Sequence, residues 1–229
     1  MFSLLKKLFS GIGLLEEAYN DTVKMLADSF QMFKESVRSL RHSDNADLEI
    51  DLYEADKTIN HYMREVRRKV LSHLAIAQPA DAAAALILVS VVIDVERIAD
   101  YTKNIYELAS AHPKRLIGGD FEADLDKFEK LVSDWFEKVS QAYSQRDVES
   151  AEKLIGEERA LSKWCDSAVH RLITNPPSEL SAGEAAALTL YVRYLKRIAS
   201  HLINVASTVV KPFPQIGFKG KKADEETDQ

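Results

Sequence analysis

The sequence predicts an all-α fold built from two tandem, antiparallel three-helix bundles. Apolar residues recur at spacings of three and four along most of the chain, which is the period of a helix that buries one face. Eight glycines and six prolines in 229 residues are too few for a turn-rich β fold. One stretch of sequence also occurs twice, which indicates an internal duplication of a helical unit.

We expect four segments: residues 1–13, a first bundle at 14–112, a second bundle at 119–211 and a tail at 212–229. Residues 1–13 form a short amphipathic piece in which two lysines face several apolar residues. Two interpretations of this piece stay open. It contacts a membrane surface or a transporter, or it packs on the bundle as an ordinary terminus. The tail is charged and follows two prolines.

The first bundle begins with a helix whose apolar seam runs from Leu15 to Leu40, followed by a turn at 41–46. A second helix has its seam between Leu48 and Val70. The third helix spans 81–109 and opens with an almost unbroken apolar run at 82–93, so we expect this first half to be buried on all sides. Asp81 stands where it can cap this helix. The run is too short to cross a bilayer, which takes about 17–25 residues.

The second bundle follows a linker at 112–120. Its first helix carries apolar residues from Phe121 to Ala142, and a turn at 145–147 leads into a helix that reaches Leu172. A break at 175–178 precedes the last helix, which Ser181 or Ser178 caps. The third helix of each bundle is expected to be central.

A row of polar side chains lies in the second half of the helix at 81–109. Glu96, Asp100 and Asn104 are spaced i, i+4 and i+8, and the same line runs back through apolar residues toward the core. Aligned carboxylates repel unless a cation, a proton or water separates them, and such oxygen ligands suit hard cations or iron. The alternative is that the helix emerges from the core here and that Arg97 and Lys103 neutralise Asp100 at the surface.

The duplication is clearest around this row. Residues 95–100 read Val-Glu-Arg-Ile-Ala-Asp and residues 195–200 read Leu-Lys-Arg-Ile-Ala-Ser, an offset of 100 residues (196 − 96). Asn104 and Asn204 continue the match. A tandem repeat with this motif resembles the PhoU family of bacterial and archaeal regulators of phosphate uptake, and the resemblance covers residues 14–211.

The resemblance implies a multinuclear metal cluster, often of iron, held by the acidic motif of each copy. Here it implies iron, zinc or a similar ion at the first copy, with Glu96 and Asp100 as ligands and Asp56 and Asn60 of the preceding helix facing them. Asn104, His201 and Asn204 are the candidate outer or repeat-equivalent residues, although a hydrogen-bonded helix histidine is the preferred reading of His201. In the second copy Lys196 and Ser200 replace the two acids. Because an ammonium group repels a cation, we expect that copy to have lost its site.

The resemblance also implies a non-enzymatic adaptor of phosphate transport and phosphate signalling. Its partners would be an ABC-type phosphate transporter, a phosphate permease or a phosphate-sensing histidine kinase, contacted through the face that carries Glu96 and Asp100. Two other classes remain open: a metal-dependent enzyme or metal store built on the same acids, and a metal-free helical scaffold. We also expect a homodimer or higher oligomer.

Composition and short motifs argue against several functional classes and indicate a cellular location. The net charge of −6 argues against general nucleic-acid binding. The single cysteine, Cys165, is read as a packed small residue and is consistent with a reducing compartment, so we expect a cytoplasmic protein. No phosphate-binding glycine motif occurs, and no histidine has a glutamate three residues before it, which excludes the ferritin-like di-iron pattern.

Overall fold

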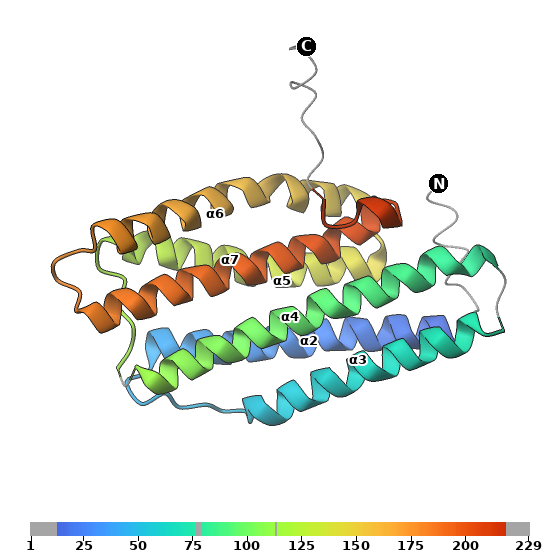
Figure 1. Cartoon of the computed structure of the whole chain (residues 1–229), viewed down its shortest axis with the longest axis horizontal. Helices are drawn as coiled ribbons and strands as arrows, with labels where there is room; N and C mark the ends of the chain where they lie inside the picture. The colour runs from blue at the N-terminus through green and yellow to red at the C-terminus, as the bar shows by residue number, and fades with distance from the viewer. Residues whose placement is uncertain (1–12, 77–78, 113, 219–229) are drawn as a thin grey trace, which may run out of the picture.

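A computed structural model of the chain describes residues 13–76, 79–112 and 114–218, and these residues are helical apart from short connections (Figure 1). The all-α prediction is therefore confirmed. The amphipathic segment predicted at 1–13 and the charged residues 219–229 lie outside the described residues, apart from Gly13, which begins the first helix.

The first repeat consists of α2 (Gly13–His42), α3 (Leu52–Leu74) and α4 (Ala82–Ala111), which pack on one another. Asp51 caps α3 by accepting hydrogen bonds from the backbone amides of Tyr53 and Glu54, each at 3.0 Å. The turn predicted from Arg41 begins too early, because α2 continues to His42. Contacts across the repeats hold this helix end, including a 2.8 Å bond from the Leu116 amide to the Leu40 carbonyl.

The expected cap of α4 by Asp81 is wrong. Residues Pro79–Asp81 form a short 3-10 turn, η1, and Asp81 adopts helical dihedral angles instead of the extended conformation of a capping residue. Its carboxylate makes no capping bond and lies 3.1 Å from the Nε2 atom of His73. Asp81 therefore ties the end of α3 to the start of α4.

The second repeat consists of α5 (Glu122–Gln145), α6 (Val148–Thr174) and α7 (Ala182–Val210), preceded by the 3-10 turn η2 (Gly119–Phe121) and followed by η3 (Phe213–Gln215). Ser181, and not Ser178, caps α7. Its hydroxyl accepts from the Glu184 amide at 3.2 Å, and the Glu184 carboxylate accepts from the Ser181 amide at 2.8 Å. Pro212 follows the end of α7, as the sequence indicates.

The six long helices form two layers. In Figure 1, α6, α7, α4 and α3 follow one another across the view, and α4 and α7 run antiparallel at the centre. The second layer contains α2 and α5, which pack on each other. The prediction that the third helix of each repeat is central is thus confirmed, since α4 and α7 form the main joint between the repeats.

The expectation that the first half of α4 is buried on all sides is wrong. Leu86 is 43% exposed and Ile93 is 39% exposed, because α2, α3 and α7 cover only part of its circumference. The pattern of burial in α4 recurs in α7 with the same offset of 100 residues: Leu88 and Leu188 are both fully buried, as are Val92 and Val192 and other matched positions. The duplication therefore extends to the packing.

The α2–α5 contact makes the two repeats one body. Phe30 and Phe33 of α2 lie against Phe136 of α5, with ring centroids 5.0 and 5.1 Å apart. At the other end the Tyr19 ring stacks on Tyr143 at 4.9 Å. Aromatic pairs of this kind are worth about 0.5–1.5 kcal/mol beyond their buried area. Among the helices that the structure describes, none is both long and apolar enough to cross a membrane.

Candidate functional site

The predicted acidic row lies on the side of α4 that packs against α3, and we call this line of contact between the two helices the acidic groove. Glu96, Asp100 and Asn104 are half-buried, with 15% and 29% of the two acidic side chains exposed. The row is therefore neither in the core nor fully in solvent. Asp56 of α3 contacts α4 through Lys103, and Asn60 Nδ2 lies 3.4 Å from Asp56 Oδ2 on the same helix.

Two cations of α4 already compensate these acids. Lys103 Nζ lies 3.0 Å from Asp56 Oδ2 and 3.8 Å from Asp100 Oδ1. Arg97 lies 3.1 Å from Asp100 and 3.5 Å from Glu96. The alternative in which Arg97 and Lys103 neutralise Asp100 is therefore supported by the geometry. The sequence indicated only the contact of Lys103 with Asp100 of its own helix, but Lys103 also pairs with Asp56 and so joins α4 to α3.

Glu96 is the least compensated acid of the row. Burial raises the pKa of its carboxyl group, and the negative charges of Asp100 and Asp56 raise it further, while Arg97 and Arg67 act in the opposite direction. The groove thus retains a tendency to hold a proton or another positive charge at Glu96.

The arrangement does not fit a multinuclear metal cluster. Nowhere in residues 13–76, 79–112 and 114–218 do three or more His, Cys, Asp or Glu side chains gather closely enough to hold a metal ion. At the acidic row the reason is visible, because the ammonium group of Lys103 lies between Asp56 and Asp100, where a cation would need their oxygens. The residues that the family resemblance implies as metal ligands are present, but Lys103 forms ion pairs with two of them, Asp56 and Asp100.

The second copy differs as the sequence indicates. Lys196 is 18% exposed and its ammonium lies 2.5 Å from Asp166 Oδ1, while Ser200 stands at the position of Asp100. The nearby thiol of Cys165 is buried, and burial raises its pKa to about 12, which fits a packed small residue better than a reactive one.

His201 and Asn204 lie at the joint between the repeats. Asp94 of α4 sits 2.7 Å from His201 Nδ1 and accepts a hydrogen bond from Asn204 Nδ2 at 2.9 Å. The His201 ring also stacks on Tyr101 at 5.9 Å. Both residues therefore tie α7 to α4. Arg197 adds to the same joint by donating to the Tyr101 hydroxyl at 3.1 Å.

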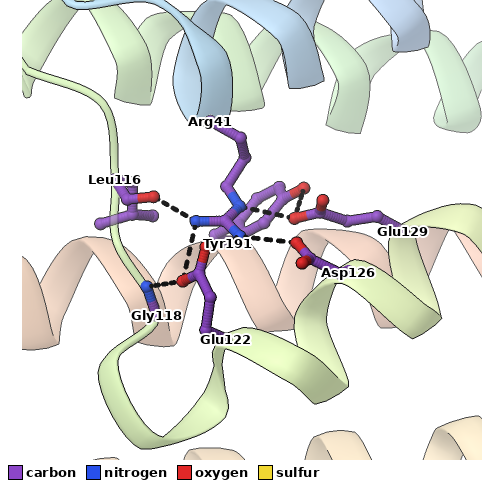
Figure 2. Close-up of polar contacts among 7 residues, drawn as sticks. All are labelled: Arg41, Leu116, Gly118, Glu122, Asp126, Glu129 and Tyr191. Carbon is purple, nitrogen blue, oxygen red and sulfur yellow. Dashed lines mark hydrogen bonds and ion pairs between the residues drawn. The ribbon is translucent and has the colours of Figure 1, made fainter.

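Arg41 is the most buried charged residue of the described part of the chain, and the sequence analysis did not single it out. The Arg41 side chain is 1% exposed, and its guanidinium contacts Glu129 at 2.7 Å, Glu122 at 2.8 Å and Asp126 at 3.2 Å (Figure 2). It also donates to the Leu116 carbonyl. Tyr191 completes the network by donating to Glu129 at 2.8 Å. These partners come from the linker, α5 and α7, so Arg41 fastens the first repeat to the second.

The signal for this network was present in the sequence. Glu122, Asp126 and Glu129 repeat with spacings of four and three, so they share one face of α5. Arg41 itself gave no signal, because it is followed by polar turn-forming residues. The buried groups of Arg41, Glu129 and Tyr191 satisfy one another, so we assign the network a structural role.

Comparison with known proteins identifies the fold that carries these sites. A model of the PhoU domain matches the chain twice, at residues 22–109 and 125–209. The chain belongs to the PhoU family. The matched ranges fall in the two repeats, while the exact bundle boundaries at 14–112 and 119–211 stay a prediction.

Two solved structures share the fold of this PhoU chain. PhoU from Pseudomonas aeruginosa is 20% identical, with a TM-score of 0.76 over 86% of this chain and 95% of that one. The phosphate transport system regulatory protein PhoU from Streptococcus pneumoniae is 16% identical, with a TM-score of 0.59 over 91% of this chain and 95% of that one. No curated protein matches the sequence.

Proposed function

We propose that this PhoU-family protein is an adaptor that regulates phosphate transport by binding a phosphate transporter, either ABC-type or a permease, or a phosphate-sensing histidine kinase. The observation that supports this role most directly is the pair of PhoU domains joined into one body by α4, α7 and Arg41. Such a body can present one surface to a partner without an active site. The proposal includes a cytoplasmic location, peripheral contact with the membrane through the partner, and assembly into a homodimer or higher oligomer.

The surface we assign to the partner is the layer formed by α3, α4, α7 and α6. Arg97 and Arg197 are matched by the duplication and are both exposed at its centre. Tyr101 and Tyr194 lie beside them with their ring centroids 6.0 Å apart. Arginine and tyrosine are enriched among the residues that dominate binding energy at protein interfaces. This surface includes the acidic face of the first repeat that the sequence suggested and extends it across the seam.

Co-purification tests the proposal. Membranes from phosphate-replete cells that contain the transporter and the sensor kinase should retain the native protein, and the double variant R97E/R197E should lose most of this retention. The matched control is Lys130→Glu, which reverses an exposed charge on α5 in the other layer. If neither the transporter nor the kinase is retained by the native protein, the adaptor role is wrong. Equal loss in both variants would instead refute the assigned surface.

A metal-bound first repeat is a second candidate, favoured by the raised pKa of Glu96. It requires the Lys103 ammonium to leave Asp56 and Asp100. The measurement is the metal content of the native protein beside that of the double variant E96Q/D100N. Metal that is present in the first and lost in the second would support this candidate, and metal well above one site per chain would favour a store. Equal, negligible content in both would refute it.

A further inference from the structure

The acidic groove of the first repeat has a counterpart in the second repeat, between α6 and α7. In α3 the residues Leu52, Ile59, Val66 and His73 are buried, and in α6 the buried residues Ala151, Glu158, Cys165 and Leu172 each follow 99 residues later (151 − 52). The matched heptads fix the register of α6 against α3. The register of α7 against α4 is 100 residues (188 − 88), as the matched buried positions show.

These registers show how the groove changed between the two copies. On α6, Asp56 becomes Ile155 and Asn60 becomes Arg159. On α7, Glu96 becomes Lys196, Asp100 becomes Ser200 and Lys103 becomes Ile203, while Asn104 is kept as Asn204. The acids of the first groove are therefore replaced by apolar, hydroxyl or cationic side chains. The lysine that fills the first groove has no cationic counterpart in the second.

The second groove is an open cleft of about 680 Å³, a size typical of small-molecule sites. All the counterpart residues just named line it, together with Lys211, Ser162, Ser207 and Phe218. Its positive groups are Arg159, Lys196 and Lys211, and its one carboxylate is that of the buried Glu158. Lys196 is paired with Asp166 and Lys211 donates to the Phe218 carbonyl, so both ammonium groups are held at the cleft by fixed partners.

We propose that this cleft binds a phosphate group, carried either by free inorganic phosphate or by a small organic phosphate ester. Three cations face two carboxylates, that of Glu158 in the lining and that of Asp166 paired with Lys196, and the remaining positive charge favours an anion. The hydroxyls of Ser162 and Ser200 supply donors for its oxygens. Ile155, Ile203 and Phe218 form an apolar wall of the cleft. This wall could contact the organic part of a phosphate ester, whereas free phosphate has no apolar part to place against it. The inference does not depend on the identity of the protein partner.

Isothermal titration of the full-length protein with inorganic phosphate and with AMP tests this site. We expect binding that weakens at least tenfold in the double variant Arg159→Gln/Lys196→Met. The variant Ser200→Asp restores the acid of the first copy at a half-buried position and should also weaken binding at least tenfold by charge repulsion. Because it changes no packed apolar residue, it keeps the test valid if the double variant folds poorly. Lys163→Gln, an exposed lysine of α6 outside the cleft lining, is the matched control and should bind as the native protein does.

The two probes separate the two sources of the phosphate group. Tighter binding of AMP than of inorganic phosphate would assign the cleft to an ester whose body contacts the apolar wall. Equal affinities would assign it to free phosphate. The proposal is overturned if neither probe binds the native protein, or if Ser200→Asp binds both as tightly as the native protein does.

Discussion

Replacement of Arg41 by methionine should strongly destabilise the protein. The substitution keeps the length of an apolar stem but removes the guanidinium that contacts Glu129, whose side chain is 9% exposed. Glu122 and Asp126 are 44% and 62% exposed, so water would compensate them and they contribute little to the loss. The cost therefore falls mainly on one buried carboxylate. Breaking a buried ion pair in this way costs about 3–5 kcal/mol.

The lost hydrogen bond to the Leu116 carbonyl adds about 1 kcal/mol. Urea unfolding followed by circular dichroism measures the total, and Lys130→Met, an exposed neighbour of Glu129 on α5, is the control with an expected change within about 0.5 kcal/mol. The double variant R41M/E129Q should recover about half of the loss, because the neutral amide still accepts a bond from Tyr191 and no longer needs a cation. A cost below about 1 kcal/mol for R41M, or no recovery in the double variant, would refute this account.

The destabilisation by R41M should also depend on pH. Burial raises the pKa of the Glu129 carboxyl group, and Arg41 acts against that rise. Without Arg41 the pKa in the folded state rises further above its unfolded value, so the protonated carboxyl favours folding at low pH and this contribution is lost as the pH rises through the folded pKa. The deficit of R41M relative to the native protein should therefore be larger at pH 7 than at pH 5. A deficit independent of pH would show that Glu129 is not the group left unpaired.

Three further predictions concern the acidic groove and the helix cap. The pKa of Glu96 is raised in the folded protein, so its charged form opposes folding. E96Q should therefore stabilise the protein at pH 7 by about 0.2–0.5 kcal/mol and leave its stability unchanged at pH 3. A loss of stability at pH 7 in urea unfolding would contradict this. Lys103→Met should cost about 1 kcal/mol and raise the Mn²⁺ content after dialysis, whereas unchanged metal content would show that Lys103 does not hold the site against cations. Ser181→Ala should cost about 1 kcal/mol through the lost capping box, and the exposed Ser178→Ala serves as its control, with equal costs speaking against the assigned cap.

Periodicity and duplication were enough to predict the architecture. The apolar seams and the central position of α4 and α7 follow from spacings within one helix or one copy. The breaks were expected at 41–46, 145–147 and 175–178 and lie at 43–51, 146–147 and 175–181. The second seam was expected to begin at Leu48, but α3 begins at Leu52, so that boundary was wrong. The cap of α7 by Ser181 was also within reach, because a capping box is a local pattern. Patterns within a short stretch of sequence therefore predicted the helices and the α7 cap, because these features depend on contacts between residues close in the chain.

The contacts between distant segments could not be predicted in the same way. Arg41 reaches partners 75 to 88 residues away, and no pattern near position 41 indicates that its charge is buried. Asp81 is a residue type that caps helices, and it is also one that can pair with a histidine. Only the tertiary structure, which brings His73 to within 3.1 Å, shows that its carboxylate makes the second contact. Lys103 was visible as a neighbour of Asp100, but its closer contact with Asp56 depends on the packing of α3 against α4.

The structure also indicates why the two copies could differ so strongly in charge. The joint between the repeats uses Asp94 with His201 on one layer and Arg41 with Glu129 on the other, and none of these four residues lines the α6–α7 cleft. The buried positions that build each bundle match between the copies, so the duplication kept its packing. The groove positions whose charge changed pair within their own copy, as Glu96 and Asp100 do with Arg97 and as Lys196 does with Asp166. Asn204, which also bonds Asp94 across the joint, is an asparagine in both copies. A change from acid to base at the charged positions therefore costs neither the core nor the joint. One groove can then hold its own lysine while the other stays open to an anion.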